Sequence, residues 1–382
     1  MGKSIKKILI TGGAGFIGTS LTRTLLTENH EITILDNFHP QIHGSKDGLV
    51  EDLVGKVNLI IGDVTDKKIL FQALEGKDVV IHFAAETGTG QSMYSFSQYS
   101  NVNIQATAFL CDYLINKKHS IKTVILASSR AIYGEGKYYS DEFGVVYPES
   151  RNLANLKNNF EVTCPISGKN NLKLMPTDEL SKIQPSSFYG ITKQVQEQMI
   201  ILATQLKKIR SFSLRYQNVY GPGQSLKNPY TGILSIFTTL AIQNKEINIF
   251  EDGLESRDFV HIDDVVNVTK LCLKIKKNNQ FILNVGSGAP TKVIDVAQEI
   301  VKYLKSNSKI TISGNFREGD IRHNYADLTR LKNIINYQPK WNFTEGLQDY
   351  LNWALKQKDI KENNINYNQS LNFLKERGLM NG

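Results

Sequence analysis

The sequence predicts an α/β fold, a Rossmann-type doubly wound parallel sheet with a smaller C-terminal α/β subdomain that binds substrate. Short apolar runs alternate with amphipathic segments through the first half of the chain, as in a parallel sheet wrapped by helices. The runs are apolar throughout, which suits strands that are covered on both faces. A glycine-rich turn over residues 11–18 separates the first run from the first amphipathic segment, the order typical of a dinucleotide-binding unit.

The elements of the first domain are expected in regular order. Strands are predicted at residues 7–10, 31–35, 57–61, 79–83, 123–127 and 211–215, and helices at 16–27, 67–75, 100–117 and 189–206. From about 135 to 184 no period is visible and Gly, Asn, Pro and Lys are frequent, which predicts an irregular surface insertion. The first domain therefore spans residues 1–220.

After residue 220 the alternation of strands and helices loosens. Helices are predicted near 231–243, 262–275 and 291–306, within a second, discontinuous subdomain that covers mainly residues 221–356. The Lys- and Asn-rich tail, residues 357–382, is expected to add one helix near 370–377.

Composition argues against several classes of protein. The 382 residues include 45 Lys and Arg against 37 Asp and Glu, but the basic side chains are scattered, which argues against a nucleic-acid partner. No run of about 18 apolar residues occurs and the first strand follows the N-terminus directly, so neither a membrane span nor a signal peptide is expected. The three widely spaced cysteines fit a reducing, cytoplasmic location.

The glycine-rich turn is the strongest indication of a cofactor site. Gly12 permits a tight turn, Gly15 lets backbone N–H groups approach a pyrophosphate, and Gly18 allows close packing of helix on strand. Phe16 and Ile17 then begin the helix, whose N-terminus offers unpaired donors to phosphate oxygens.

Acidic residues follow the second and third strands. Asp36, with Asn37 after it, lies where a carboxylate binds the adenosine ribose hydroxyls and repels a 2′-phosphate, which favours NAD over NADP. Asp63, with Val64 after it, could meet the adenine or could instead cap the next helix. The first domain is therefore predicted to bind NAD.

Tyr189 and Lys193 form a candidate catalytic pair. They lie four residues apart on a predicted helix and so share a face, where the ammonium and the positive nicotinamide would lower the pKa of the phenol from about 10. Such a tyrosine can exchange a proton with a sugar hydroxyl while a hydride moves to or from the cofactor. Ser129 ends the fifth strand, at the edge where open α/β sheets bind ligands.

These motifs resemble those of the extended short-chain dehydrogenase/reductase family, and in particular its nucleotide-sugar epimerases and dehydratases. The resemblance covers roughly residues 5–350. It extends to the segments 82–85, 103–107 (with Ala106 in place of the family's Gly), 129–134, 214–223, 257–264 and 317–322. It implies that the second subdomain binds a nucleotide sugar.

The resemblance implies a role for each matching residue. Tyr189 would be the acid and base, Lys193 would bind the nicotinamide ribose, and Ser129 would hydrogen-bond the reacting hydroxyl. The nucleotide diphosphate would be held by Asn218, Arg257 and Arg317, although Asn218 could cap a turn and the arginines could be structural. His82 and Asn103 are expected to make local structural contacts. The expected cofactor-binding residues are Gly12, Gly15, Phe16, Ile17, Gly18, Asp36, Asn37, Asp63, Val64, Ala84, Tyr189 and Lys193.

The two residues after Ser129 separate the family's reactions. The 4,6-dehydratases carry an Asp–Glu pair there and the decarboxylating members a Glu at the second position, whereas this chain has Arg130 and Ala131. Without that carboxylate neither elimination nor decarboxylation has its acid or base, which leaves a 4-epimerase or a 4-ketoreductase. Asp36 disfavours the exchangeable NADPH of ketoreductases, so a 4-epimerase that retains NAD is favoured.

Three loops, residues 86–92, 128–136 and 217–232, resemble those of dTDP-L-rhamnose 4-epimerases, which interconvert dTDP-L-rhamnose and dTDP-6-deoxy-L-talose. Thr87, Gly88 and Arg130 would then border the sugar. A UDP-hexose or UDP-N-acetylhexosamine substrate, or net reduction of a nucleotide 4-keto sugar, are the alternatives. A homodimer through the helices near 100–117 and 189–206 is also implied. Cys164 lies in half of a zinc knuckle whose second thiol is replaced by Ser167, so no metal is expected.

Overall fold

The structure is a computed structural model that describes residues 5–45, 47–151, 156, 159–226, 228, 232–357, 360 and 367–381. A seven-stranded sheet lies at its centre, and its strands run in the order β3-β2-β1-β4-β5-β9-β13. Every neighbouring pair in this sheet is parallel, which confirms the predicted fold class. The strands are β1 (Lys7–Thr11), β2 (Glu31–Asp36), β3 (Asn58–Ile61), β4 (Val79–His82), β5 (Thr123–Ser129), β9 (Arg210–Tyr216) and β13 (Gln280–Val285).

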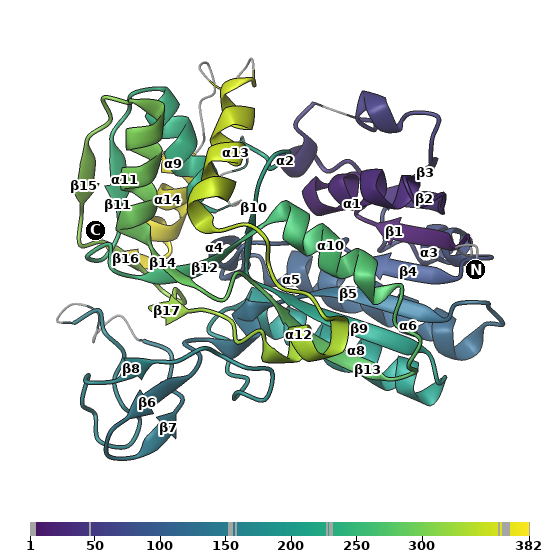
Figure 1. Cartoon of the computed structure of the whole chain (residues 1–382), viewed down its shortest axis with the longest axis horizontal. Coiled ribbons are helices and arrows are strands. Elements are labelled where there is room, and N and C mark those ends of the chain that lie inside the picture. The colour runs from purple at the N-terminus through teal and green to yellow at the C-terminus, as the bar shows by residue number, and fades with distance from the viewer. Residues whose placement is uncertain are drawn as a thin grey trace.

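Helices cover both faces of this sheet (Figure 1). One face packs against α1 (Phe16–Leu26), α10 (Ile262–Cys272) and α12 (Thr329–Ile335). The other face packs against α3 (Lys67–Leu74), α6 (Ala106–Asn116) and α8 (Phe188–Leu206). Successive residues of one strand therefore enter different cores, as Ile8 and Leu9 of β1 do, which explains why the strands are apolar throughout.

The strand order reverses between β1 and β4. The chain moves outward in one direction from β1 to β3 and in the other from β4 to β13. In open α/β sheets a ligand crevice opens at such a reversal, beyond the carboxyl ends of the strands. The glycine-rich turn follows β1, and Ser129 ends β5, so both lie at this edge.

The second subdomain is built around its own apolar core. Its strands are β10 (Asn218–Tyr220), β12 (Ser256–His261), β14 (Pro290–Lys292) and β17 (His323–Asn324) in one sheet and β11 (Ile247–Ile249) with β15 (Ile310–Ile312) in another. The helices α9 (Ile233–Ile242), α11 (Val293–Leu304) and α13 (Phe343–Leu355) pack on these strands. The predicted helix at 231–243 corresponds to α9, although residue 231 lies outside the described residues.

The last strand of the central sheet was not predicted. β13 comes from the range assigned mainly to the second subdomain, yet it pairs with β9 along its whole length. Phe281 of β13 stacks on Phe212 of β9 with ring centroids 4.9 Å apart. The predicted helix at 262–275, observed as α10, likewise packs against α1 of the first domain. The chain thus returns to the first domain after residue 261, because α10 and β13 bury their apolar side chains against α1 and β9.

The insertion at 135–184 has secondary structure, in contrast to the irregular segment expected. β6 (Tyr138–Ser140) pairs antiparallel with both β7 (Gly144–Val146) and β8 (Lys173–Leu174). These strands enclose a small core of Tyr138, Val146, Val162 and Cys164. Strands of two or three residues are too short to produce a recognisable alternation in the sequence.

Short elements complete the fold. Between β2 and β5 lie α2 (Pro40–His43), α4 (Thr89–Ser92), α5 (Phe96–Tyr99), one turn of 3-10 helix (Glu51–Leu53) and a π-helical segment (Ser100–Gln105) that continues into α6. A second 3-10 turn (Arg130–Tyr133) follows β5. The tail contains α14 (Tyr367–Glu376), close to the expected 370–377, and β18 (Met380–Asn381), which pairs with β16 (Phe316–Arg317).

We predict that Arg215→Ala destabilises the protein far more than a comparable change at the surface. The Arg215 guanidinium is buried and contacts Glu197 at 3.1 Å (Nε to Oε2) and 2.5 Å (Nη2 to Oε1). Removing one partner of a buried pair costs about 3–5 kcal/mol of unfolding free energy. Urea denaturation measures this loss.

The matched control is Arg23→Ala, whose guanidinium pairs with Asp52 with both side chains about half exposed. It should cost less than about 1 kcal/mol. Equal losses for the two variants would contradict the assigned role of the buried pair.

Candidate active site

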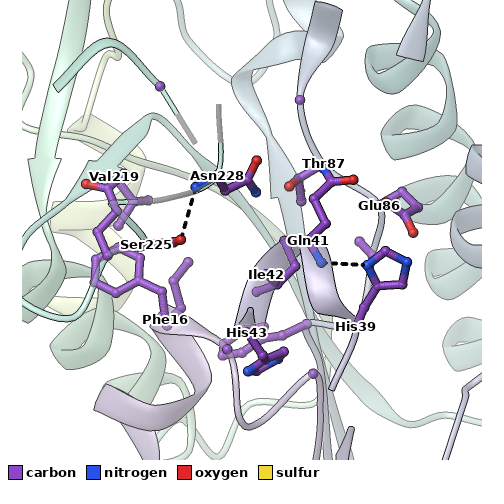
Figure 2. A pocket seen from close by; sticks show the side chains of 18 of the residues that line it. Phe16, His39, Gln41, Ile42, His43, Glu86, Thr87, Val219, Ser225 and Asn228 are labelled. Carbon is purple, nitrogen blue, oxygen red and sulfur yellow. Dashed lines mark hydrogen bonds between the residues drawn. The ribbon is translucent and has the colours of Figure 1, made fainter. Parts of the chain in front are cut away.

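One large cavity, about 1690 Å³, lies at the carboxyl edge of the sheet, between the two subdomains. Figure 2 shows Phe16, Val219 and Ser225 on one side of it and Glu86 and His39 on the other. The structure brings most of the predicted site residues to its wall. These are Gly12, Gly15, Phe16, Ile17, Asp36, Asn37, Asp63, Val64, Ala84, Thr87, Gly88, Ser129, Arg130, Tyr189, Lys193 and Asn218.

The glycine-rich turn packs tightly against the loop after β4 and leaves the N-terminus of α1 uncapped by any side chain. Gly12 has a φ of +66°, and a Cβ there would lie 2.7 Å from the backbone nitrogen of Ala84. Gly15 caps α1 without a side-chain hydrogen bond, and the first turn of α1 carries no acidic residue, so its N–H groups suit a phosphate. Gly18 does not line the cavity; a Cβ on it would lie 2.6 Å from Gly13, which explains its packing role.

Asp36 lies at the end of β2 with its carboxylate facing the same cavity. It accepts hydrogen bonds from the backbone N–H groups of Ala14 and Phe38, both at 3.0 Å, and lies 3.3 Å from Nε2 of His43. These contacts fix its orientation but do not use all of its acceptor capacity. A carboxylate in this place can accept from ribose hydroxyls and repels a 2′-phosphate.

Asp63 caps a local turn. It accepts hydrogen bonds from Asn37 Nδ2 at 2.7 Å and from the backbone N–H of Thr65 at 2.8 Å, whereas the N-cap of α3 is Asp66. Burial alone would raise the pKa of Asp63, but the hydrogen bonds from Thr65 and Asn37 outweigh it and hold that pKa below its ordinary value. The residue thus remains an anionic wall of the cavity.

Tyr189 and Lys193 share one face of α8, as predicted. The helix begins after Ser187, whose hydroxyl accepts from the N–H of Gly190. Lys193 Nζ lies 5.8 Å from the centroid of the Tyr189 ring and donates to the carbonyl of Ala127 at 2.9 Å. Burial lowers the pKa of Lys193 to about 7.

The lowering of the Tyr189 pKa that is expected from Lys193 together with a bound nicotinamide stays a prediction. Burial raises the pKa of Tyr189 above its ordinary value, and a hydrogen bond with Ser129 and the charge of Arg130 oppose this only in part. The reason is that the phenol is removed from water and that Lys193 is itself too buried to hold its proton firmly. Ser129 also accepts from the N–H of Ala131 at 3.1 Å, which orients its hydroxyl beside the tyrosine.

Arg130 places a second cation beside Tyr189. Its Nε donates to Asn218 Oδ1 at 3.3 Å, so Asn218 orients an arginine. Burial, and then the charge of Arg257, lower the pKa of Arg130 to about 10. Within the described residues no carboxylate lies within 4.0 Å of its guanidinium nitrogens. The reacting end of the cavity therefore carries positive charge where dehydratase-like members would carry a carboxylate.

Arg257 and Arg317 are not among the residues that line the cavity, and their role in holding the diphosphate stays a prediction. Arg257 is buried and donates to the carbonyls of Ser256, Ile321 and Arg322 at 2.7–2.9 Å. Arg317 pairs with Asp320 at 2.8–2.9 Å. Both arginines therefore use some of their donors to hold the segment around 317–322.

His82 and Asn103 make the local contacts that were predicted. Nδ1 of His82 lies 2.8 Å from Thr11 Oγ1, and burial lowers the pKa of this histidine to about 3. Asn103, in the π-helical segment, accepts from the N–H of Glu86 at 2.8 Å and donates to Thr192 Oγ1 at 2.9 Å. It therefore ties the loop after β4 to the catalytic helix.

Several wall residues were missed by the sequence reasoning. Gln41 of α2 exchanges two amide hydrogen bonds with Gln91 of α4, at 2.9 and 3.2 Å, and so joins the loops that follow β2 and β4. No motif signals this pair. The C-terminal region contributes Trp353, Gln357, Ile360, Gln369, Ser370 and Phe373. The only sequence signal there was one short helix, with no indication of where it packs.

The described residues contain neither a membrane-spanning helix nor a cluster of metal ligands. Within them, no helix has the length and apolarity that crossing a bilayer requires. Nor do three or more His, Cys, Asp or Glu side chains gather there in a way that would hold a metal ion. Cys164 instead belongs to a tight turn in which its carbonyl accepts from the N–H of Gly168 at 2.9 Å.

The fold and this cavity define a dinucleotide-dependent enzyme of the nucleotide-sugar type, and comparison with known proteins agrees. The model of the NAD dependent epimerase/dehydratase family matches residues 8–152 and 159–286. The chain belongs to this family. The cradle at Gly12 and Gly15, the open helix N-terminus and Asp36 fit NAD, which is its cofactor.

A dTDP-L-rhamnose 4-epimerase of Burkholderia thailandensis is 36% identical over 93% of this chain and 97% of its own length. Among solved structures, a UDP-N-acetylglucosamine 4-epimerase of Methanobrevibacter ruminantium is 26% identical, with a TM-score of 0.74, over 93% of this chain and all of its own. A UDP-glucuronic acid 4-epimerase of Bacillus cereus, solved with UDP-glucuronic acid and NAD, is 25% identical, with a TM-score of 0.73. The match covers 92% of this chain and 99% of that one.

We predict that Tyr189→Phe abolishes most catalysis and leaves cofactor binding intact. The change removes the one phenol that contacts Ser129 in the cavity but keeps the ring that packs edge-on against Tyr99 at 6.4 Å. Turnover should fall about 10²- to 10⁴-fold, the usual contribution of an acid–base group. NAD content per chain, measured after denaturation, should not change. Tyr139→Phe, in the insertion, is the control, and wild-type turnover in Tyr189→Phe would overturn the assignment.

Proposed function

We propose that this protein is an NAD-dependent nucleotide-sugar 4-epimerase that interconverts dTDP-L-rhamnose and dTDP-6-deoxy-L-talose. One observation carries the proposal. Ser129, Tyr189 and Lys193 line the same cavity as the dinucleotide cradle, and the positions after Ser129 hold Arg130 and Ala131 in place of a carboxylate. A reaction confined to oxidation and reduction at carbon 4 needs the serine, the tyrosine, the lysine and the bound dinucleotide. It does not need a carboxylate after Ser129.

The protein groups divide the work of the reaction. Bound NAD supplies the chemistry of accepting a hydride from carbon 4 and returning it. Tyr189, as phenolate, takes the proton of the 4-hydroxyl and later gives it back to the oxygen of the 4-keto sugar. Ser129 contacts Tyr189 and holds the same oxygen in line. Lys193, fixed through the carbonyl of Ala127, orients the nicotinamide ribose from the same helix face.

Arg130 is placed to stabilise negative charge on the two oxygens that exchange the proton. Its guanidinium is held by Asn218, and within the described residues it forms no direct ion pair, although the charges of Asp320 and Glu135 favour its protonated form. A cation in this place stabilises the phenolate and any negative charge on the oxygen at carbon 4. The arginine thereby offsets part of the cost of ionising a buried tyrosine.

Asp36 favours epimerisation over net reduction. A 4-epimerase regenerates its cofactor in each cycle, so tightly held NAD is sufficient, whereas net reduction requires a cofactor that exchanges. The carboxylate at the end of β2 suits NAD, and the paired amides of Gln41 and Gln91 tie together two loops that flank the cavity. Both features suit retention of the cofactor.

The choice of sugar rests on the Burkholderia thailandensis relative and on the loop resemblance. UDP-sugars are named for the similar solved structures, so a UDP-hexose or UDP-N-acetylhexosamine is the second candidate. A homodimer through α6 and α8 stays a prediction; it is supported by Ile191, Leu202 and Leu206 of α8, which are 42–66% exposed. The residues proposed to hold substrate are Thr87, Gly88, Ser129, Arg130, Asn218, Arg257 and Arg317.

The proposal predicts that the purified protein converts dTDP-L-rhamnose into its 4-epimer without net change in NADH. Proton NMR follows the sugar, and absorbance follows NADH. UDP-glucose and UDP-N-acetylglucosamine, assayed in parallel, are the comparison substrates. Conversion of a UDP-sugar alone would overturn the assignment of the sugar, and stoichiometric consumption of NADH with a 4-keto sugar would overturn epimerisation.

A second prediction concerns pH. The reaction needs the phenolate of Tyr189, whose pKa is raised by burial and held down in part by Arg130, so the rate rises with pH through that pKa. Arg130→Gln removes the charge and raises the pKa, so the acid limb of kcat should move to higher pH by about one pH unit. Arg130→Lys keeps a charge and should move it less. A limb that does not move in Arg130→Gln would show that Arg130 does not act on Tyr189.

A further inference from the structure

The C-terminal segment 367–381 is anchored on the first domain by its helix. Leu374 of α14 is buried and approaches Gly90 of α4, since a Cβ built on that glycine would lie 3.8 Å from Leu374 Cδ1. The guanidinium of Arg377 lies over the ring of Tyr94 with 5.2 Å to the centroid. Both contacts fall just after Thr87 and Gly88, the loop expected to border the sugar.

The same segment is anchored on the second subdomain by its last strand. β18 pairs antiparallel with β16, placing Met380 opposite Arg317, and the N–H of Glu318 donates to the carbonyl of Leu379 at 2.9 Å. The C-terminus accordingly lies near β16 in Figure 1. Gly319, in the turn after β16, in turn approaches Met93 at the end of α4. The segment therefore bridges the two subdomains beside the sugar loop.

The part of α14 that precedes these anchors turns three side chains to the cavity. Gln369, Ser370 and Phe373 line it, and their spacing places them on one helix face. Phe373 is 40% exposed although it is large and apolar, as expected of a side chain that faces a ligand space. The charged residues of the same helix, Lys375 and Glu376, do not line the cavity. These three side chains are uncharged, an amide, a hydroxyl and an aromatic ring, and the guanidinium of Arg377 lies over the Phe373 ring with 5.2 Å to the centroid.

We propose that the face of α14 formed by Gln369, Ser370 and Phe373 is the outer wall of the sugar site and determines which neutral sugar ring is accepted. This inference rests on the proposed function. The amide and hydroxyl suit ring hydroxyls, and the aromatic ring suits an apolar sugar edge such as a 6-methyl group. None of the three side chains is a cation that would pair with a carboxylate at carbon 6.

The wall also retains the oxidised intermediate. When the hydride has left carbon 4 and the proton has left its hydroxyl oxygen, the sugar is a 4-keto compound, two electrons more oxidised; Tyr189 would hold the proton, and bound NAD would supply the place for the hydride. The keto sugar must turn within the cavity before hydride returns. A loosened outer wall lets it escape, and each escape leaves one NADH bound and one enzyme unable to start a new cycle.

The test compares the full chain with Gln369→Ala/Phe373→Ala and with Lys375→Ala, the control on the same helix. For the double variant, kcat/KM with dTDP-L-rhamnose should fall roughly 10- to 100-fold, as for loss of pocket contacts to one substrate group. Bound NADH should accumulate during turnover, free 4-keto sugar should appear in the NMR spectrum, and the NAD content before turnover should equal that of wild type. Calorimetric Kd values should rise for dTDP-L-rhamnose and stay constant for dTDP.

Each other outcome has a distinct meaning. Equal kcat/KM and equal Kd for dTDP-L-rhamnose in wild type and the double variant would overturn the inference, as would an equal loss in Lys375→Ala. A wild type that binds dTDP-L-rhamnose without converting it would refute the proposed activity, while the calorimetric comparison would still decide whether α14 contacts the sugar. If wild type binds only a UDP-sugar, the same comparison with that sugar decides it. If wild type binds no nucleotide sugar, both proposals fall.

Discussion

The active-site geometry depends on the buried ion pair between Arg215 of β9 and Glu197 of α8. Glu197 lies one turn after Lys193, and its carboxylate also accepts a hydrogen bond from Ser128, the neighbour of Ser129, at 2.8 Å. Arg215 further donates to the hydroxyl of Tyr133, at the end of the turn that begins with Arg130. One interaction thus joins the strand, the helix and the turn that carry the reacting groups. Because both charges are buried, neither can be re-solvated by a small movement.

A second ionic cluster extends this rigidity to the insertion and the second subdomain. Arg322, which is fully buried, contacts Glu161 of the insertion at 2.6 Å and Asp252 at 2.7 Å. Arg151 of the insertion contacts Glu135 at 3.1 Å and Glu251 at 2.9 Å. Glu135 follows the turn after the catalytic strand by two residues. The insertion is therefore fixed both to the segment that follows β5 and to the second subdomain.

The electrostatics of the cavity fit a reaction that ionises a phenol transiently. Burial disfavours the charged forms of both Tyr189 and Lys193, so the lysine alone does not lower the phenol pKa. Arg130 supplies a cation from the opposite element, and a positively charged nicotinamide supplies another whenever the cofactor is oxidised. The phenolate is thus favoured when oxidation of the sugar is about to begin and less favoured afterwards. Carboxylates at the positions after Ser129 would oppose this, which connects the residue choice there with the type of reaction.

The sequence by itself determined the parallel sheet, the dinucleotide turn, the ribose carboxylate and the Ser129, Tyr189 and Lys193 set, because each depends on local spacing or on the end of one strand. Only the tertiary structure decided that β13 completes the sheet and that the C-terminal helix walls the cavity, since both result from packing between segments far apart in the chain. It also decided that Arg257 donates to backbone carbonyls and that Arg317 pairs with Asp320. Burial of the phenol, which raises the pKa of Tyr189, is likewise a result of packing. Motif and spacing identify which groups are present, whereas burial and the competition between neighbouring partners decide what each group does.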